Sequence, residues 1–136
     1  MANTLKLLWR YLWAGPNTML GLAAAAASAS LPTLAHGILL CRSNRGFANW
    51  FLTRRGYCAI TLGHLVLVTS QASPQIMDHE MVHVRQSERW GPLFVPAYLT
   101  GMVIARVQGR DPYLDNSFEL EARRQDGSST PQGPVA

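Results

Sequence analysis

Three polar residues at helical spacing give the sequence its clearest chemical signal. His79, Glu80 and His83 follow one another in the order H-E-x-x-H. Residues four positions apart on an α-helix lie on one face, about 6 Å from each other, so the two histidines can direct imidazole nitrogens at one metal ion. The pattern therefore predicts a metal site that is built on a helix.

Glu80 is placed to take part in hydrolysis at such a site. It lies about 100° around the helix from His79, where its carboxylate reaches a water beside the ion. A hydrolytic zinc ion takes two neutral imidazoles, one anionic ligand and an open fourth position. It lowers the pKa of the water to about 7, and a neighbouring carboxylate accepts the proton as the water attacks a carbonyl. The spacing predicts Zn²⁺ as the cofactor and Glu80 as the general base.

The third ligand must come from another part of the chain. Glu88 is the nearest carboxylate, but it points about 140° away from the histidine face of the same helix. Glu119 and Glu121 remain, on a short terminal helix that begins at Asn116 or Ser117 as a cap residue. The residues alone leave the choice between these two glutamates open.

The motif residues carry a resemblance to a known family. H-E-x-x-H at 79–83, followed by E-x-x-A from Glu119 to Ala122, resembles the gluzincin metallopeptidases, above all the HtpX and CAAX-prenyl protease group and the minigluzincins. Residues 57–123 also resemble short bacterial HExxH proteins that share "TLGH", "HVRQ-ERWGP" and "PAYL". The likeness to gluzincins implies a zincin-like fold, a peptide or protein substrate, and Glu119 as the third zinc ligand.

One position departs from the gluzincin pattern. The family has an Asp directly after E-x-x-A, which supports a metal-binding histidine, and this chain has Arg123 there. Another residue must therefore supply the contact, and losing such a contact reduces metal affinity or activity about 10–100-fold. The candidate substitutes are Asp78, Asp115, Asn116 and Glu121.

Other polar residues are candidates for contact with the site or with substrate. Gln86 lies seven positions after His79, hence on the same helix face, and either supports the site or faces solvent. His64 either lines a substrate groove or occupies a turn. Tyr98 and Tyr113 either offer a hydroxyl to a developing oxyanion or serve packing.

Local signals predict an α+β fold, mostly helical with a small sheet or hairpin. Helices are expected over Phe47–Arg55, from Ser73-Pro74 to a stop at Gly91-Pro92, and over Leu93–Val107. A strand is expected over His36–Arg42 and a hairpin or two strands over 57–70, where β-branched and aromatic residues gather. By likeness to zincins, Leu65–Thr69 is expected to hold a peptide substrate by strand addition.

The chain is expected to divide into three parts: residues 1–35 as an apolar, membrane-associated segment, 36–125 as a compact metal-binding domain, and 126–136 as a disordered polar tail. In the first part, an amphipathic stretch over Leu5–Trp13 meets an Ala-rich stretch at Gly15-Pro16. Three interpretations stay open. They are a kinked membrane helix over Leu5–Leu31, a buried core helix, and a signal peptide that exports the protein.

Charge and composition bear on partners and location. The chain has 136 residues, 48% hydrophobic and only 15% charged, so membrane contact is a real option. Residues 1–77 contain six basic residues and no acidic one, which suits an anionic lipid surface. No recognition helix or stacking motif accompanies the arginines, which argues against nucleic acid. If the N-terminal segment crosses the membrane, the arginines at 42–55 predict that the C-terminal part lies in the cytoplasm. Cys41 and Cys58 form either two free thiols or one bridge.

The sequence therefore predicts a zinc-dependent metallopeptidase that hydrolyses peptide bonds at a membrane, with its catalytic part in the cytoplasm. The alternative is a non-catalytic, membrane-associated protein in which a zinc ion fixes the H-E-x-x-H helix against the C-terminal segment. A soluble basic module with a chance motif is the third interpretation. The state of the fourth coordination position separates the first two, because catalysis needs it open.

Overall fold

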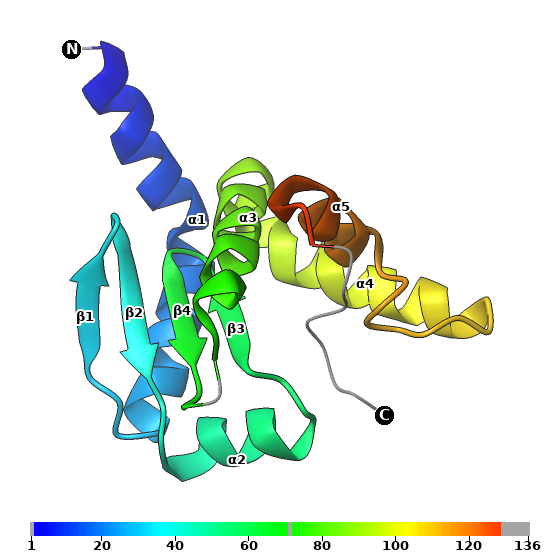
Figure 1. The fold of residues 1–136 in the computed structure, drawn as a ribbon. Coiled ribbons are helices and arrows are strands. Elements are labelled where there is room, and N and C mark those ends of the chain that lie inside the picture. The colour runs from blue at the N-terminus through cyan, green and yellow to red at the C-terminus, as the bar shows by residue number, and fades with distance from the viewer. Residues whose placement is uncertain (1, 71, 129–136) are drawn as a thin grey trace.

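The computed structural model describes residues 2–70 and 72–128. These residues form an α+β fold in which helices surround a small four-stranded sheet (Figure 1). The elements, in chain order, are α1 (Ala2–Ala27), β1 (Pro32–Ala35), β2 (Ile38–Arg42), α2 (Gly46–Arg54), β3 (Ala59–Leu62), β4 (Leu65–Val68), α3 (Pro74–Trp90), the 3₁₀ turn η1 (Gly91–Leu93), α4 (Phe94–Val107) and α5 (Ser117–Asp126).

The sheet is mixed and has the strand order β1-β2-β4-β3. Strands β2 and β4 are parallel, and the two outer pairs are antiparallel. Every residue of β4 is apolar and buried, as expected of an inner strand with both faces covered. The expected strands at 36–42 and 57–70 are confirmed, whereas β1 was not predicted.

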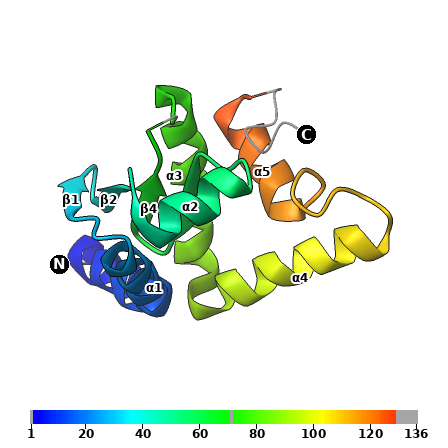
Figure 2. The same ribbon diagram turned by 90° about the horizontal axis from the view of Figure 1, so that it is seen from below.

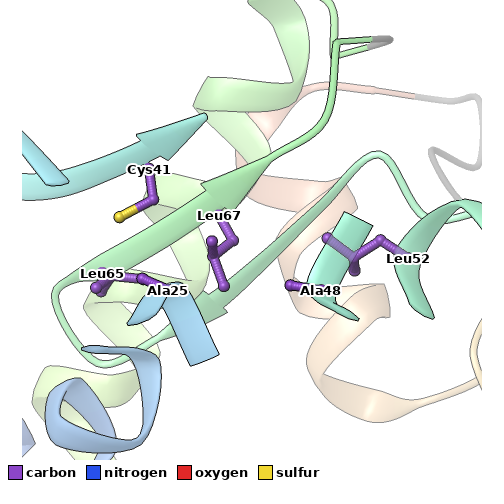
Figure 3. Close-up of a cluster of buried hydrophobic side chains, with 6 residues drawn as sticks. All are labelled: Ala25, Cys41, Ala48, Leu52, Leu65 and Leu67. Carbon is purple, nitrogen blue, oxygen red and sulfur yellow. The ribbon is translucent and has the colours of Figure 1, made fainter. Parts of the chain in front are cut away.

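The two faces of the sheet pack against different helices. Residues on one face form a cluster with α1 and α2 (Figure 3): Ala25, Cys41, Ala48, Leu52, Leu65 and Leu67. Residues on the other face pack against α3 in a second cluster of Ile38, Val66, Val68 and Val84. The sheet is thus the middle of three layers, and its α3 side carries the H-E-x-x-H residues. Cys41 and Cys58 are free thiols.

The order of the strands corrects one expectation about substrate binding. Leu65–Thr69 was expected to offer a free edge, but β4 lies between β2 and β3. Its backbone groups are therefore engaged on both sides. In the described part of the chain, β3 pairs with β4 alone, so β3 has the free edge on this side of the sheet.

Helix α3 begins and ends at the predicted residues, with Ser73 before it and Gly91 after it. At Gly91, φ is +56°, and a Cβ there would overlap the ring of Trp13 on α1. Only glycine fits a position with this backbone conformation and this close a neighbour. The chain turns here, so that α3 and α4 run in different directions (Figure 2).

Helix α1 runs through Gly15-Pro16, so the two stretches form one helix, as the interpretation of a single helix over Leu5–Leu31 expected. Pro16 lies inside one helix of 26 residues. The second half of α1 is fixed by packing: Ala14 and Ala25 are buried, and Asn17 Nδ2 donates a hydrogen bond of 2.7 Å to the Gly91 carbonyl. These contacts offset the backbone hydrogen bond that proline removes.

One helical stretch in the described residues is long and apolar enough to cross a membrane by length and composition alone. It is Pro74–Val107, with 34 residues and a mean hydropathy of 1.2. The apolar stretch was expected in the N-terminal segment, so this expectation is wrong. Lys6, Arg10 and Asn17 interrupt the apolar residues of α1. The stretch consists of α3, η1 and α4, of which α4 alone extends about 21 Å against the roughly 30 Å of a bilayer core.

The C-terminal boundary also lies later than expected. Helix α5 runs through Asp126, the first residue of the predicted disordered tail. Asn116 is its N-cap, as predicted, and its side chain accepts a hydrogen bond from the backbone N–H of Phe118 at 3.1 Å. Residues 129–136 of the predicted tail lie outside the described residues.

Truncation of the inner strand tests this packing. Leu67 is 1% exposed on β4 and lies in the cluster beneath α1 and α2, so we expect Leu67→Ala to lower the free energy of unfolding by about 2–5 kcal/mol. Leu34→Ala on the outer strand β1 is the control, because Leu34 is 80% exposed and should change stability by less than about 0.5 kcal/mol. Urea denaturation followed by circular dichroism measures both, and equal losses would contradict the assignment of β4 to the core.

Candidate metal centre

Three side chains that can bind a metal ion meet between α3 and α5. The Nε2 atom of His79 lies 3.0 Å from Glu119 Oε2, and that of His83 lies 3.2 Å from Glu119 Oε1. The two Nε2 atoms are 3.2 Å apart. In a tetrahedral zinc site with bonds of about 2.0 Å, neighbouring ligand atoms are separated by about 3.3 Å. The group could hold a metal ion, and its spacing fits a small one.

The Nδ1 atoms of His79 and His83 form hydrogen bonds that decide which nitrogen of each ring carries the proton. His79 Nδ1 lies 2.7 Å from Asp126 Oδ2, and His83 Nδ1 lies 2.8 Å from Gln86 Oε1. Both partners accept, so each Nδ1 carries the proton and each Nε2 of the neutral ring keeps a lone pair. Two lone pairs and a carboxylate then face one another, an arrangement that repels itself unless a cation lies between them.

The pKa values of His83 and Glu119 are shifted in the directions that favour a positive charge next to the Glu119 carboxylate. Burial disfavours the charged form of His83, but the hydrogen bond and negative charge of Glu119 outweigh it and raise the pKa of His83 to about 9. Burial likewise acts to raise the pKa of Glu119, yet its contacts with the two histidines hold it well below its usual range.

Asp126 makes the contact that the family pattern assigns to the position of Arg123. None of the four candidate substitutes contacts His79: Asp78 is exposed, Asp115 Oδ2 accepts from the Asp111 N–H, Asn116 caps α5, and Glu121 accepts from Gln86. Sequence reasoning missed Asp126 because it was assigned to the tail. Its spacing of seven residues from Glu119, two helical turns on one face, was the available signal.

Gln86 contacts His83, in agreement with the first of its two predicted roles, which was to support the site. Its oxygen faces His83 Nδ1, and its Nε2 donates to the Phe118 carbonyl at 3.1 Å and to Glu121 Oε2 at 2.9 Å. Because the amide donates to α5, its oxygen must be the atom that accepts from the ring. Gln86 therefore fixes both the tautomer of His83 and the distance between α3 and α5.

Glu119 is held in place from α4. The Tyr98 hydroxyl donates to Glu119 Oε1 at 2.5 Å, so this tyrosine positions the carboxylate. Asn116 Nδ2 donates to the Tyr98 carbonyl at 3.1 Å, and a Cβ on Gly101 would overlap the Asn116 side chain. The start of α5 is thereby fixed against α4, which sets the position of Glu119 relative to α3.

Glu80 faces the sheet and is buried. Thr61 Oγ1 on β3 donates to Glu80 Oε2 at 2.5 Å, which leaves the other carboxylate oxygen without this partner. Burial raises the pKa of Glu80, against the lowering effects of His83 and Thr61. A carboxyl group whose pKa is shifted toward neutrality is suited to accept and return a proton.

Glu80, His83 and Glu119 line one cavity of about 290 Å³. Its walls are otherwise largely apolar and come from α2, β3 and α4, with Leu52, Ile60 and Leu99 among them. Tyr113 also lines it, and burial together with the charge of Glu119 raises the pKa of its hydroxyl, which stays a donor. The cavity can receive an apolar group close to the three ligands.

His64 lies apart from this cavity. It is 4% exposed in the turn between β3 and β4, where Nε2 lies 3.0 Å from Glu88 Oε1 and the ring packs on Tyr11 with a centroid distance of 4.3 Å. Of its two predicted roles, the position in a turn is the one observed. His64 connects the turn to α1 and α3.

No protein-family model, curated protein or solved structure matches this chain.

Metal titration tests the donor set. We expect the purified chain to bind one zinc ion and to gain about 2.7 kcal/mol of stability at a free zinc concentration of a hundred times Kd. His83→Gln should abolish both effects, and His36→Asn, at an exposed histidine with positive φ, should change neither. Elemental analysis and thermal unfolding provide the measurements, and zinc binding by the His83→Gln chain would remove this histidine from the site.

Removal of the contact to His79 tests the role of Asp126. We expect Asp126→Asn to weaken zinc binding by about 10–100-fold, because an amide supports the ring less well than a carboxylate does. Asp78→Asn is the matched control on the exposed side of α3 and should leave affinity unchanged. Competition with a zinc-chelating dye measures both affinities, and equal values in the two variants would show that Asp126 does not support the site.

Proposed function

We propose that this chain is a zinc-dependent metallopeptidase of the gluzincin kind. The observation that carries the proposal is that the H-E-x-x-H glutamate and two of the three metal-ligand candidates line one cavity, next to the free edge of β3. A purely structural ion does not need a carboxylate beside an apolar cavity. A hydrolase needs both, to move a proton and to receive substrate.

The donor set suits zinc among the common metals. Two imidazole nitrogens and one carboxylate form a borderline-soft set, whereas Mg²⁺ and Ca²⁺ prefer oxygen ligands. His79, His83 and Glu119 would hold the ion, with Asp126 and Gln86 behind the histidines. Zinc supplies Lewis-acid chemistry, by polarising a peptide carbonyl and by making water acidic enough to lose a proton near neutral pH.

The side chains around the ligands divide the remaining work of peptide hydrolysis. Glu80 accepts the proton of the attacking water on the carboxylate oxygen that Thr61 does not hold, and returns it to the departing amine. Tyr113, whose hydroxyl stays protonated, can donate to the oxygen of the attacked carbonyl. Tyr98 keeps Glu119 in position.

A peptide substrate is proposed to bind along β3. An extended peptide adds to a free strand edge through backbone hydrogen bonds, and alternate side chains then enter pockets. The apolar cavity selects a peptide with a large apolar side chain next to the scissile bond. Association with membrane lipid, with the catalytic part in the cytoplasm, belongs to the same proposal, whereas export by a signal peptide stays the alternative.

A non-catalytic role for the ion is the second candidate, and one observation favours it. His79 and Glu119 are 2% and 1% exposed, and they join α3 to α5 as a structural metal site does. The two functions differ in the fourth coordination position. A protein ligand there indicates a structural site, and an open position indicates an enzyme.

A variant of Glu80 separates these functions. We expect Glu80→Gln to keep one zinc ion per chain and to lower peptide turnover about 10²–10⁴-fold, because an amide cannot accept the proton. Glu88→Gln, on the side of α3 that faces His64, is the control and should keep turnover. Cleavage of a peptide library measured by mass spectrometry gives the rates. Unchanged turnover in Glu80→Gln would exclude this residue as the base. A complete lack of turnover, in the parent chain as well as in both variants, would favour the structural role.

A further inference from the structure

Helix α2 presents a continuous group of exposed aromatic side chains. Phe47, Trp50 and Phe51 are 61%, 53% and 36% exposed. The ring centroids of Phe47 and Trp50 are 5.8 Å apart, and those of Phe47 and Phe51 are 6.2 Å apart. The opposite side of α2 supplies Ala48 and Leu52 to the core (Figure 3). The aromatic residues are therefore not the core side of this helix, and their exposure needs another explanation.

Arginines surround these rings. The guanidinium carbon of Arg54 lies 5.7 Å from the centre of the Trp50 ring, and that of Arg55 lies 5.3 Å from the centre of the Phe51 ring. Arg42 and Arg45 flank the helix and are also exposed. Among the described residues, none of these four arginines forms an ion pair with a carboxylate. We name Phe47, Trp50, Phe51, Arg54 and Arg55 the α2 face.

The α2 face adjoins the cavity of the metal centre. Phe51 and Arg55 belong to the α2 face and also line the cavity, as does Leu99 of α4. Leu99 is itself 54% exposed, so the cavity wall includes exposed apolar side chains of both helices. Residues of both α2 and α4 line this cavity. Whatever binds the α2 face therefore lies next to the entrance of the cavity.

We propose that the α2 face docks on a bilayer that contains anionic lipid, and that the entrance of the cavity opens at the lipid surface. Trp and Phe favour the interface between headgroups and acyl chains, and arginine near an anionic leaflet gains electrostatic attraction. The α2 face is complementary in charge to such a surface, since Arg54 and Arg55 lie beside its rings and neither forms an ion pair with a carboxylate among the described residues. A second copy of the chain fits less well, because a symmetric contact would oppose cations to cations.

Docking in this orientation narrows the substrate class, and this step rests on the proposed peptidase function. Residues of α2 and α4 line the cavity beside β3, so a peptide that enters it from the docked α2 face passes along the membrane surface. The substrates are then membrane-associated chains, cleaved at an apolar residue close to the headgroups. Phe51 and Arg55 would then serve both lipid binding and substrate selection, because they belong to the α2 face and also line the cavity.

Vesicle binding tests the docking surface without any need for turnover. The full chain is mixed with sucrose-loaded vesicles of phosphatidylcholine, with or without phosphatidylglycerol, and sedimented at low and high salt. We expect binding to the anionic vesicles that weakens in salt and is much lower on phosphatidylcholine alone. Equal binding to both kinds of vesicle, or recovery of all the protein in the supernatant, would overturn the proposal.

Apolar substitutions locate the surface. Phe47→Ser with Trp50→Ser should weaken binding to the anionic vesicles at least about tenfold, because two large rings no longer enter the interface. Leu8→Ser with Leu12→Ser, at exposed positions of α1, is the matched control and should leave most of the binding intact. If the α1 variant loses binding and the α2 variant keeps it, α1 is the membrane surface and the proposal fails. Thermal unfolding shows that each variant is folded.

Charge substitutions supply an independent arm. Arg45→Gln with Arg54→Gln should weaken binding about 30-fold and reduce its salt dependence. Arg110→Gln with Arg124→Gln removes the same charge from exposed positions elsewhere and should have little effect. Equal losses in the two pairs would show that net charge, and not the α2 face, determines binding. The Glu80→Gln and His83→Gln chains should bind vesicles like the parent, so failure of the metal or peptidase proposals is recognised separately.

Discussion

The central constraint in this molecule is that three hydrogen-bond acceptors, two imidazole nitrogens and a carboxylate, meet in a buried space between α3 and α5. Such groups repel one another in a medium of low dielectric constant, and only a cation makes their approach favourable. The contacts around them all serve to keep the acceptors convergent. Asp126 and Gln86 hold protons on the outer ring nitrogens, and the Tyr98 hydroxyl directs Glu119. The fold thus favours a positive charge between His79, His83 and Glu119.

Elements far apart in the sequence meet this constraint through apolar packing and polar contacts together. Helix α3 is held by the apolar face of the sheet, on which Val84 packs with Val66 and Val68. Helix α5 is held by Phe118, whose ring packs on Trp90, Phe94 and Tyr98, and by polar contacts through Asn116 to α4 and through Gln86 to α3. An apolar contact tolerates small shifts, whereas a hydrogen bond between buried groups fixes distance and direction. The polar contacts are accordingly the ones that set the positions of the ligand atoms.

Sequence reasoning succeeded where the chemistry is local. The H-E-x-x-H spacing, the Pro74 start and the Gly91 end of α3, and the Asn116 cap depend on a few neighbouring residues, and the structure agrees with each. It failed where contacts between distant residues decide. The parallel pairing of β2 with β4 and the role of Asp126 both depend on packing that no short window contains. The assignment of Glu119 over Glu121 needed a family resemblance, although both lie on the same short helix.

Arg123 stands where the gluzincin pattern has an aspartate, and the contact to His79 expected from that position comes from another residue of α5. Arg123 donates through its guanidinium to the Leu114 carbonyl, so it fixes the loop before α5 instead of supporting a histidine. The carboxylate one helical turn later, Asp126, lies on the same side of α5 as Glu119 and reaches His79 Nδ1. A helix can therefore supply the same support from either position, provided that its end stays ordered. In this chain the last turn of α5 carries Asp126, so the contact to His79 depends on the order of that turn.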